Sequence, residues 1–317
     1  MNNMSMVTEF ILMGFAGPWK LQILQTGLFL VIYLAALMGN GLIITITSLD
    51  PCLHTPMYFF LRNLSLFDIC LISAVVPKSI VNSLTHSNYI SFLGCVTQAF
   101  LVAFSAATEF FLLTVMSVDR YAAICHPLHY EVIMNRSTCV QMSFFSCLTG
   151  GFLSMIHTAV TFTLSYCESI EIQQFFCDIS QVLAISCSEN ITAEIVFILI
   201  SAILDICCFI CIIISYTYIF STVRKIPSTE GQSKAYSTCI PHLVVVVLFL
   251  STALAAYLKP ILASASFTDL ILSAFYIMLP PSLNPVIYGL RNKAMKVGLE
   301  KLTTKFLSKE NLLFFQT

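Results

Sequence analysis

Long apolar stretches separated by short polar segments account for most of the chain. A bilayer crossing needs about 20 mainly apolar residues, and seven stretches reach that length. We therefore expect spans at approximately residues 23–49, 57–84, 92–124, 138–163, 194–223, 235–258 and 269–289. This pattern predicts an all-α membrane protein, a seven-transmembrane helix bundle that forms a single domain over residues 1–317. The odd number of spans places the two termini on opposite faces of the membrane.

The distribution of Lys and Arg predicts the orientation, because cytoplasmic loops of membrane proteins are enriched in these residues. With residues 1–22 outside the cell, twelve of the 15 cations fall on the cytoplasmic side. They are Arg62, Arg120, Arg136, Arg224, Lys225, Lys234, Arg291, Lys293, Lys296, Lys301, Lys305 and Lys309. The long connection after the fourth span carries acidic charges only, which suits an outer surface. We expect a multi-pass protein of the plasma membrane with an extracellular N-terminus.

Both ends of the chain carry further signals. Residues 291–317 are predicted to form a short amphipathic helix and tail on the cytoplasmic side, where Val297 and its apolar neighbours contact membrane lipid and the lysines lie near anionic headgroups. On the outer side, Asn3 and Asn190 begin Asn-X-Ser/Thr sequons, which predicts a glycoprotein.

Composition excludes two classes of protein. The chain is 58% hydrophobic and 10% charged, whereas a soluble domain has about 25% charged residues, so most of the surface must face lipid. The formal net charge is −1 and the pI is about 6.6. No nucleic-acid partner is expected, because such a partner requires a strongly basic surface.

Four of the 13 cysteines fall on the outer side in this topology: Cys95, Cys167, Cys177 and Cys187. An even number of cysteines in an oxidising compartment predicts two disulfides. Spacing alone leaves all three pairings open.

Away from the span ends, three acidic residues lie at membrane depth, where a charged side chain is costly and marks a functional candidate. Asp68 and Glu109 lie near the middle of neighbouring spans, and Asp205 lies nearer the outer end of its span. Together with the amides of Asn40 and Asn284, the first two could bind a small hard cation or share a proton. A protonated acid hydrogen-bonded to an amide is the structural alternative.

Three spans carry small or mixed faces, since residues at i, i+3, i+4 and i+7 share one side of a helix. Alanines at this spacing leave room for an apolar small-molecule site with a few polar groups, although they also suit close helix packing. If these faces converge, we expect a small, mostly apolar organic ligand oriented by Ser201, Tyr257 or Asp205. The candidate ligand-binding residues are Ala103, Ala106, Ala107 and Phe110, then Ser201, Leu204 and Asp205, and finally Leu250, Ala253, Leu254 and Tyr257.

Several motifs, in order from Thr8 to the last predicted helix, resemble those of the rhodopsin-like G-protein-coupled receptors and, within them, the olfactory (odorant) receptors. They are Pro56-Met57-Tyr58-Phe59-Phe60-Leu61, Leu64-Ser65-Leu66-Phe67-Asp68, Met116-Ser117-Val118-Asp119-Arg120-Tyr121-Ala122-Ala123-Ile124-Cys125, Ser215-Tyr216, Lys234-Ala235-Tyr236-Ser237-Thr238-Cys239, Pro241-His242-Leu243, and Asn284-Pro285-Val286-Ile287-Tyr288.

The resemblance implies a receptor rather than an enzyme, which binds a small, mostly apolar odorant within the bundle, activates a stimulatory heterotrimeric G protein and so raises cyclic AMP. It implies one disulfide between Cys95 and Cys177 and another between Cys167 and Cys187. It also implies a candidate sodium site at Asp68 and Glu109. The residues that match the cytoplasmic G-protein switch are Asp119, Arg120, Tyr121, Tyr216, His242, Asn284, Pro285 and Tyr288.

The chain departs from the family pattern at three places. Ser117 and Val118 stand where the family has Ala and Tyr, and Pro241 stands where it has Ser. Leu250 replaces the Tyr of the usual Phe-Tyr-Gly stretch, which makes the floor of the expected pocket less polar.

Other classes of membrane protein fit less well. A secondary transporter is expected to show internal repeats and paired interrupted helices, but the proline-rich seventh span has no counterpart in the first half. An intramembrane enzyme needs a catalytic constellation, and the sequence shows none. A receptor of this family with a non-olfactory small-molecule ligand remains the alternative, and the sequence leaves open whether the protein forms a dimer.

Overall fold

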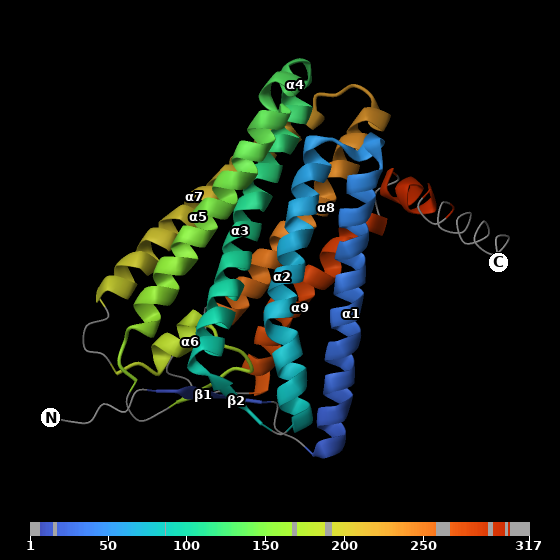
Figure 1. Ribbon diagram of the computed structural model, residues 1–317. Helices are drawn as coiled ribbons and strands as arrows, with labels where there is room; N and C mark the ends of the chain where they lie inside the picture. Colours follow the sequence, from blue (N-terminus) through green and yellow to red (C-terminus); the bar gives the residue numbers. More distant parts are fainter. Residues whose placement is uncertain are drawn as a thin grey trace, which may run out of the picture.

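The computed structural model describes residues 7–14, 18–85, 87–166, 170–187, 192–257, 267–290, 294–301 and 304. Within these residues, seven helices are long and apolar enough to cross a membrane, which confirms the predicted fold class. They run side by side as one bundle (Figure 1). Their bounds are α1 Trp19–Leu49, α2 Pro56–Thr85, α3 Phe92–Cys125, α5 Arg136–Phe162, α7 Thr192–Val223, α8 Thr229–Tyr257 and α9 Phe267–Pro285.

Two helices differ from the predicted spans in an informative way. α8 begins at Thr229 rather than at residue 235, because a helix can extend beyond the apolar stretch into polar surroundings. α9 contains Pro280 and Pro281 and ends at Pro285, where a π-helical turn, Val286–Leu290, continues the chain. Proline has no backbone N–H, so each proline removes one hydrogen bond of the regular α-helix. A single π-helical turn is a local departure from that regular pattern.

The most apolar helix is the least buried one. The most apolar window of α7 has a mean hydropathy of 3.0 and is 6% buried, whereas that of α3 has a mean hydropathy of 1.9 and is 56% buried. Lipid is as apolar as a side chain, so the outward face of a membrane helix is apolar and its polar groups turn inward. α3 accordingly contacts α2, α5, α7 and α8 and forms the central column of the bundle.

A small three-stranded sheet covers one end of the bundle, which we call the sheet end (Figure 1). β1 (Glu9–Leu12) lies between β2 (Tyr89–Ser91), to which it is antiparallel, and β3 (Glu171–Ile172), to which it is parallel. Phe10 of β1 is fully buried, and its ring lies 6.0 Å from that of Phe92 and 5.5 Å from that of Tyr166. The sequence pattern did not predict this sheet.

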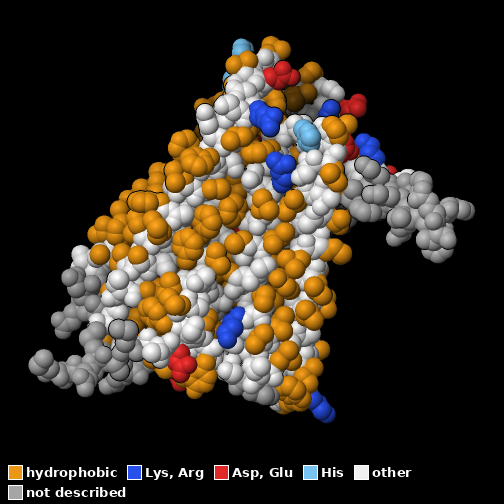
Figure 2. All heavy atoms as spheres, viewed as in Figure 1, with side chains coloured by type: hydrophobic (Ala, Val, Ile, Leu, Met, Phe, Trp, Pro, Cys, Tyr) orange, Lys and Arg blue, Asp and Glu red, His pale blue; other side chains and the backbone are white. Residues whose placement is uncertain are grey.

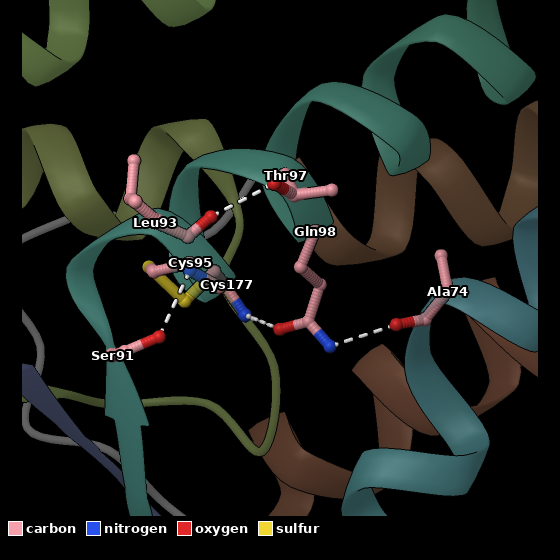
Figure 3. Close-up of a disulfide and its surroundings, with 8 residues drawn as sticks. Ala74, Ser91, Leu93, Cys95, Thr97, Gln98 and Cys177 are labelled. Carbon is pink, nitrogen blue, oxygen red and sulfur yellow. Dashed lines mark hydrogen bonds between the residues drawn. A yellow bond between two sulfur atoms is a disulfide. The ribbon is translucent and has the colours of Figure 1, made fainter.

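A disulfide joins the sheet end to the central helix (Figure 3). Cys95 of α3 is bonded to Cys177, as the resemblance implies. Gln98, one turn further along α3, accepts a hydrogen bond from the backbone N–H of Cys177 at 2.8 Å and donates one to the carbonyl oxygen of Ala74 at 2.9 Å. One amide side chain therefore ties α3 to both α2 and the loop.

Short helices and most of the visible charge lie at the other end, which we call the α4 end. α4 (Tyr130–Ile133) follows the turn η2 (Pro127–His129), and the turn η1 (Pro51–Leu53) joins α1 to α2. Figure 2 shows hydrophobic side chains over the middle of this face, with charged side chains gathered mainly at the α4 end. Residues 294–301 are helical at this end, in agreement with the predicted amphipathic helix. Another short helix, α6 (Ile179–Ala184), lies at the sheet end.

Candidate functional site

A buried polar pair links α2 to α9. The side-chain amide of Asn284 donates hydrogen bonds to both carboxyl oxygens of Asp68, at 2.9 and 3.0 Å. Asn40 of α1 donates to the carbonyl oxygen of Pro281 at 2.8 Å, an acceptor close to the proline breaks of α9. These bonds connect three helices through groups that the sequence singled out.

Glu109 of α3 is buried in the same part of the bundle, close enough to Asp68 for their charges to interact. One carboxyl oxygen of Glu109, the amide oxygen of Asn284 and the hydroxyl of Tyr288 are buried without a hydrogen-bond partner. Buried polar atoms without partners are uncommon and call for an explanation. These three oxygens are hard donors of the kind that alkali and alkaline-earth cations prefer.

The predicted ligand residues differ in where the structure places them. Ala106 and Phe110 are buried, and the ring of Phe110 stacks on that of Phe249 from α8 at 5.9 Å. Half-buried positions are Ala103, Ala107, Ser201, Leu204, Leu250 and Ala253. Asp205 and Leu254 are exposed on the described surface, and the side chain of Tyr257 lies outside the described residues.

His157 of α5, which no sequence motif marks, joins two turns of α7. Its Nδ1 lies 2.9 Å from a carboxyl oxygen of Glu194, and its Nε2 lies 2.8 Å from the hydroxyl oxygen of Ser201. Glu194, the first residue of the predicted fifth span, is fully buried. The spacing of seven residues between Glu194 and Ser201 places them on one helix face, which is the signal that could have found the pair.

The order hydroxyl, imidazole, carboxylate also occurs in hydrolase triads, but here it does not make a catalytic site. Acyl transfer needs backbone N–H groups that stabilise an oxyanion beside the nucleophile. Ser201 lies inside α7, where the backbone N–H groups around it are engaged in the helix. The arrangement can bind and orient a polar group but provides no local oxyanion hole.

At the α4 end, Asp119 holds two partners. It forms an ion pair with Arg120, and its other oxygen accepts a hydrogen bond from the hydroxyl of Tyr130 in α4 at 2.7 Å. Asp119 is fully buried. The hydroxyl of Tyr121 is hydrogen-bonded to the ring of His126 at 3.0 Å. This network joins the end of α3 to the short helix α4.

A second connection crosses from α7 to α3 through α8. The hydroxyl of Tyr216 lies 2.8 Å from Nδ1 of His242, and Nε2 of His242 lies 3.0 Å from the carbonyl oxygen of Leu113. Since a backbone carbonyl only accepts, Nε2 carries the proton and Nδ1 accepts from the hydroxyl of Tyr216. Three helices are thus joined by one imidazole.

Beside these contacts lies a cavity of about 940 Å³ that opens at the α4 end. Arg120, His242 and Tyr288 line it, together with polar residues from the first turns of α8. Among the predicted switch residues, Asn284 and Pro285 lie deeper, at the buried polar pair and at the start of the π turn. The structure therefore brings residues from α3, α8 and α9 to one cavity.

The remaining predictions concern covalent features of the outer loop. Cys187 is disulfide-bonded, and its expected partner Cys167 lies outside the described residues, as do the sequon residues Asn3 and Asn190. No group of three or more His, Cys, Asp or Glu within metal-binding reach occurs among the described residues.

Seven membrane-length helices, a buried polar core and an Asp-Arg pair beside a cavity at one end define a seven-transmembrane receptor of the rhodopsin-like class. The sequence profile of the olfactory receptor family matches residues 29–306. The chain belongs to the olfactory receptor family, and so to a class of receptors that are not enzymes.

Related proteins cover nearly the whole chain. Olfactory receptor 14A16 of Homo sapiens is 64% identical over 310 residues, which is 98% of this chain and 100% of the relative. Olfactory receptor 14A2 of Homo sapiens is 54% identical, with 98% and 99% covered. Olfactory receptor 1G1 of Gorilla gorilla gorilla is 44% identical over 300 residues, with 95% and 96% covered.

Proposed function

We propose that the protein is activated by a small, mostly apolar odorant and passes the signal to a stimulatory heterotrimeric G protein, which raises cyclic AMP. The observation that carries this proposal is the cavity at the α4 end, with Arg120 on its wall and Asp119 holding Arg120 in place. A cavity of about 940 Å³ open to one side can admit a segment of a partner protein, such as the end of a helix.

The odorant site is assigned to the half of the bundle nearer the sheet end. Ala103, Ala106 and Ala107 leave one face of α3 without bulk, and Ser201 supplies a hydroxyl from α7, which packs against α3. The stacked rings of Phe110 and Phe249 form the floor of this site, since they lie between it and His242. A ligand that changes the packing of these rings is coupled to the α8 contacts that border the cavity.

The orientation follows from the same proposal. The sheet end faces the cell exterior, where the disulfides are maintained by oxidising conditions, and the α4 end faces the cytoplasm and its G protein. The helical residues 294–301 then lie on the inner leaflet of the plasma membrane, with exposed Lys296 near anionic headgroups.

The buried acids are assigned to a sodium ion. Asp68 and Glu109 supply carboxyl oxygens, and the unpartnered oxygens of Asn284 and Tyr288 lie on the facing helix. One bound cation offsets the charge of two buried acids, which is otherwise costly at membrane depth. If sodium bound here, Asp68 of α2, Glu109 of α3 and Asn284 of α9 would hold it, and its positive charge would favour the arrangement in which these three helices stay together.

The test is a screen of chemically diverse odorants in cells that express the full chain and the olfactory G protein. We expect at least one compound to raise cyclic AMP, and we expect Arg120→Ala to abolish the response at equal surface expression. Replacing sodium by N-methylglucamine is expected to raise ligand-free activity, with no such change in Asp68→Asn. Solute flux through proteoliposomes without any cyclic AMP response would instead support a transporter.

A further inference from the structure

The contact between α5 and α7 contains a polar group whose chemistry the proposed odorant site does not explain. His157 spans two turns of α7, from Glu194 to Ser201. Glu194 is fully buried, and its second carboxyl oxygen has no hydrogen-bond partner. Only Ser201 of these three residues belongs to the predicted ligand set. His157 and Glu194 therefore affect ligand binding through the hydroxyl of Ser201, if at all.

Carboxyl groups and a tyrosine surround the imidazole. Glu194 contacts Nδ1 directly, and Asp205, one turn beyond Ser201 on α7, interacts with His157 electrostatically. Tyr166, from the segment after α5, interacts with Glu194 electrostatically, while its hydroxyl donates to the carbonyl oxygen of Thr161. These are the titratable groups that the described residues place around the pair. A buried carboxylate is costly without a cation, and His157 is the cation-forming group within reach of it.

Protonation determines which atom of Ser201 remains available. In an imidazolium both ring nitrogens donate, so Nδ1 donates to Glu194 and Nε2 donates to the oxygen of Ser201. The hydroxyl hydrogen of Ser201 then stays free to donate. In a neutral imidazole that still donates from Nδ1 to Glu194, Nε2 is an acceptor, so Ser201 donates to it and offers a ligand only its oxygen.

We propose that His157 and Glu194 are positioning residues that set the hydrogen-bond polarity of Ser201, so that the receptor prefers odorants with a carbonyl oxygen over alcohols of the same carbon skeleton. The inference rests on the proposed odorant site. A hydrogen bond polarised by a charged neighbour is stronger than a neutral one, and the carbonyl accepts it without a competing donor. Ser201 contacts the ligand, whereas His157 and Glu194 act through it.

The functional test uses linear aldehydes paired with alcohols of equal chain length, measured as cyclic AMP dose-response curves at matched surface expression. We expect the unmodified receptor to favour the aldehyde by about tenfold, as one hydrogen bond allows. Ser201→Ala is expected to remove the preference. Glu194→Gln keeps an acceptor for Nδ1 but removes the negative charge, so the imidazole becomes neutral and the preference turns toward the alcohol.

The pH dependence separates this role from simple packing. Raising the extracellular pH from about 6 to about 8 titrates histidine and is expected to shift the aldehyde-to-alcohol ratio toward the alcohol. Glu194→Gln is expected to abolish that shift. Ile203→Ala, on the exposed side of α7, is the matched control and should leave both the ratio and its pH dependence unchanged. A ratio that ignores Ser201→Ala, Glu194→Gln and pH overturns the proposal.

A measurement without ligand keeps the proposal testable if no odorant activates the receptor. In the purified full chain labelled with ¹⁵N-histidine, we expect one imidazole with protons on both nitrogens at neutral pH. Its signal should disappear in His157→Gln and become that of a neutral ring in Glu194→Gln. A neutral His157 in the unmodified protein refutes the inference, while a missing odorant response alone refutes the proposed function.

Discussion

At the sheet end, a disulfide and backbone hydrogen bonds connect the helices, whereas at the α4 end side-chain hydrogen bonds connect them around a cavity. Cys95–Cys177 and the pairing of β1 with two other strands hold the first region. Single side-chain contacts such as Tyr130 to Asp119 and Tyr216 to His242 hold the second.

The difference shows which end can change during signalling. A disulfide and a sheet do not rearrange without breaking covalent bonds or whole ladders, but a hydroxyl can change partner at little cost. A net hydrogen bond contributes about 0.5–1.5 kcal/mol, which is within the range that ligand binding can shift. We therefore expect changes at the sheet end to affect folding and changes at the α4 end to affect activity.

The largest expected effect is loss of the disulfide. Cys95→Ser should remove about 2–5 kcal/mol of stability and leave the free thiol of Cys177 buried in the loop. Surface expression, measured by antibody staining of an N-terminal tag, should fall to background. Cys52→Ser, at an exposed free cysteine, is the control. Normal expression of Cys95→Ser would show that the sheet alone holds this end.

A smaller folding effect is expected for Phe10→Ala, which empties the aromatic cluster beneath the sheet. Truncating a buried Phe in a rigid core costs about 3–5 kcal/mol, but the loops around β1 can relax into the space, so the net cost is expected to fall below that of losing the disulfide. The thermal midpoint of the purified protein should fall, with the dose-response curve of the remaining folded receptor unchanged. A changed efficacy would contradict the separation between the two ends.

The sequence predicts elements that depend on neighbouring residues better than elements that depend on contacts between distant residues. The helices of the bundle follow from bilayer thickness and local hydropathy, so their positions are readable residue by residue. The start of α8 at Thr229 was missed because its first residues are polar and lie beyond the apolar stretch. The strands of the sheet are two to four residues long and pair across the chain, as Phe10 does with Ile90, so no local pattern reveals them.

The candidate site was predictable to a similar degree. Arg120, His242 and Tyr288 stand in motifs, and the structure places them around one cavity. The partner of Ser201 was not predictable in that way, because burial of Glu194 depends on His157 from a different helix. The sequence around a single histidine in an apolar span does not indicate which neighbouring helix its side chain contacts.

At the α4 end, Tyr130→Phe is expected to raise ligand-free activity. Burial, and then the charge of Asp119, raise the pKa of Tyr130, so the hydroxyl stays protonated and donates to Asp119. Removing the donor breaks the hydrogen bond between α4 and Asp119 and so weakens the hold of α4 on the end of α3. Basal cyclic AMP should rise by about tenfold, as expected for a hydrogen bond to a charged group.

The matched control for this change is Tyr89→Phe, which removes an exposed hydroxyl at the sheet end. We expect it to alter neither basal activity nor expression. If both substitutions raise basal activity equally, the two ends do not differ in the way proposed. If Tyr130→Phe only lowers expression, its hydrogen bond serves folding rather than switching.

The smallest effect is expected where an exposed ion pair joins the helical residues 294–301 to the start of η1. Lys301 donates to Asp50 at 3.0 Å, and this bond, followed by one from the backbone N–H of Cys52, lowers the pKa of Asp50. Because folding lowers this pKa, the contribution is present above the unfolded value of about 4 and is lost as the pH falls through the folded value.

Amide hydrogen exchange of residues 294–301 measures this contact directly. At neutral pH and low salt, Lys301→Ala should speed exchange slightly, whereas Lys296→Ala, at an exposed lysine on the same helix, should not. The difference should vanish in high salt, which screens exposed pairs, and below the folded pKa of Asp50. A larger effect that survives salt would contradict a role for charge and would indicate that the packing at Gly298 holds this helix. There an added Cβ would lie 2.6 Å from the side chain of Ile46, so the helix is held by close packing rather than by charge.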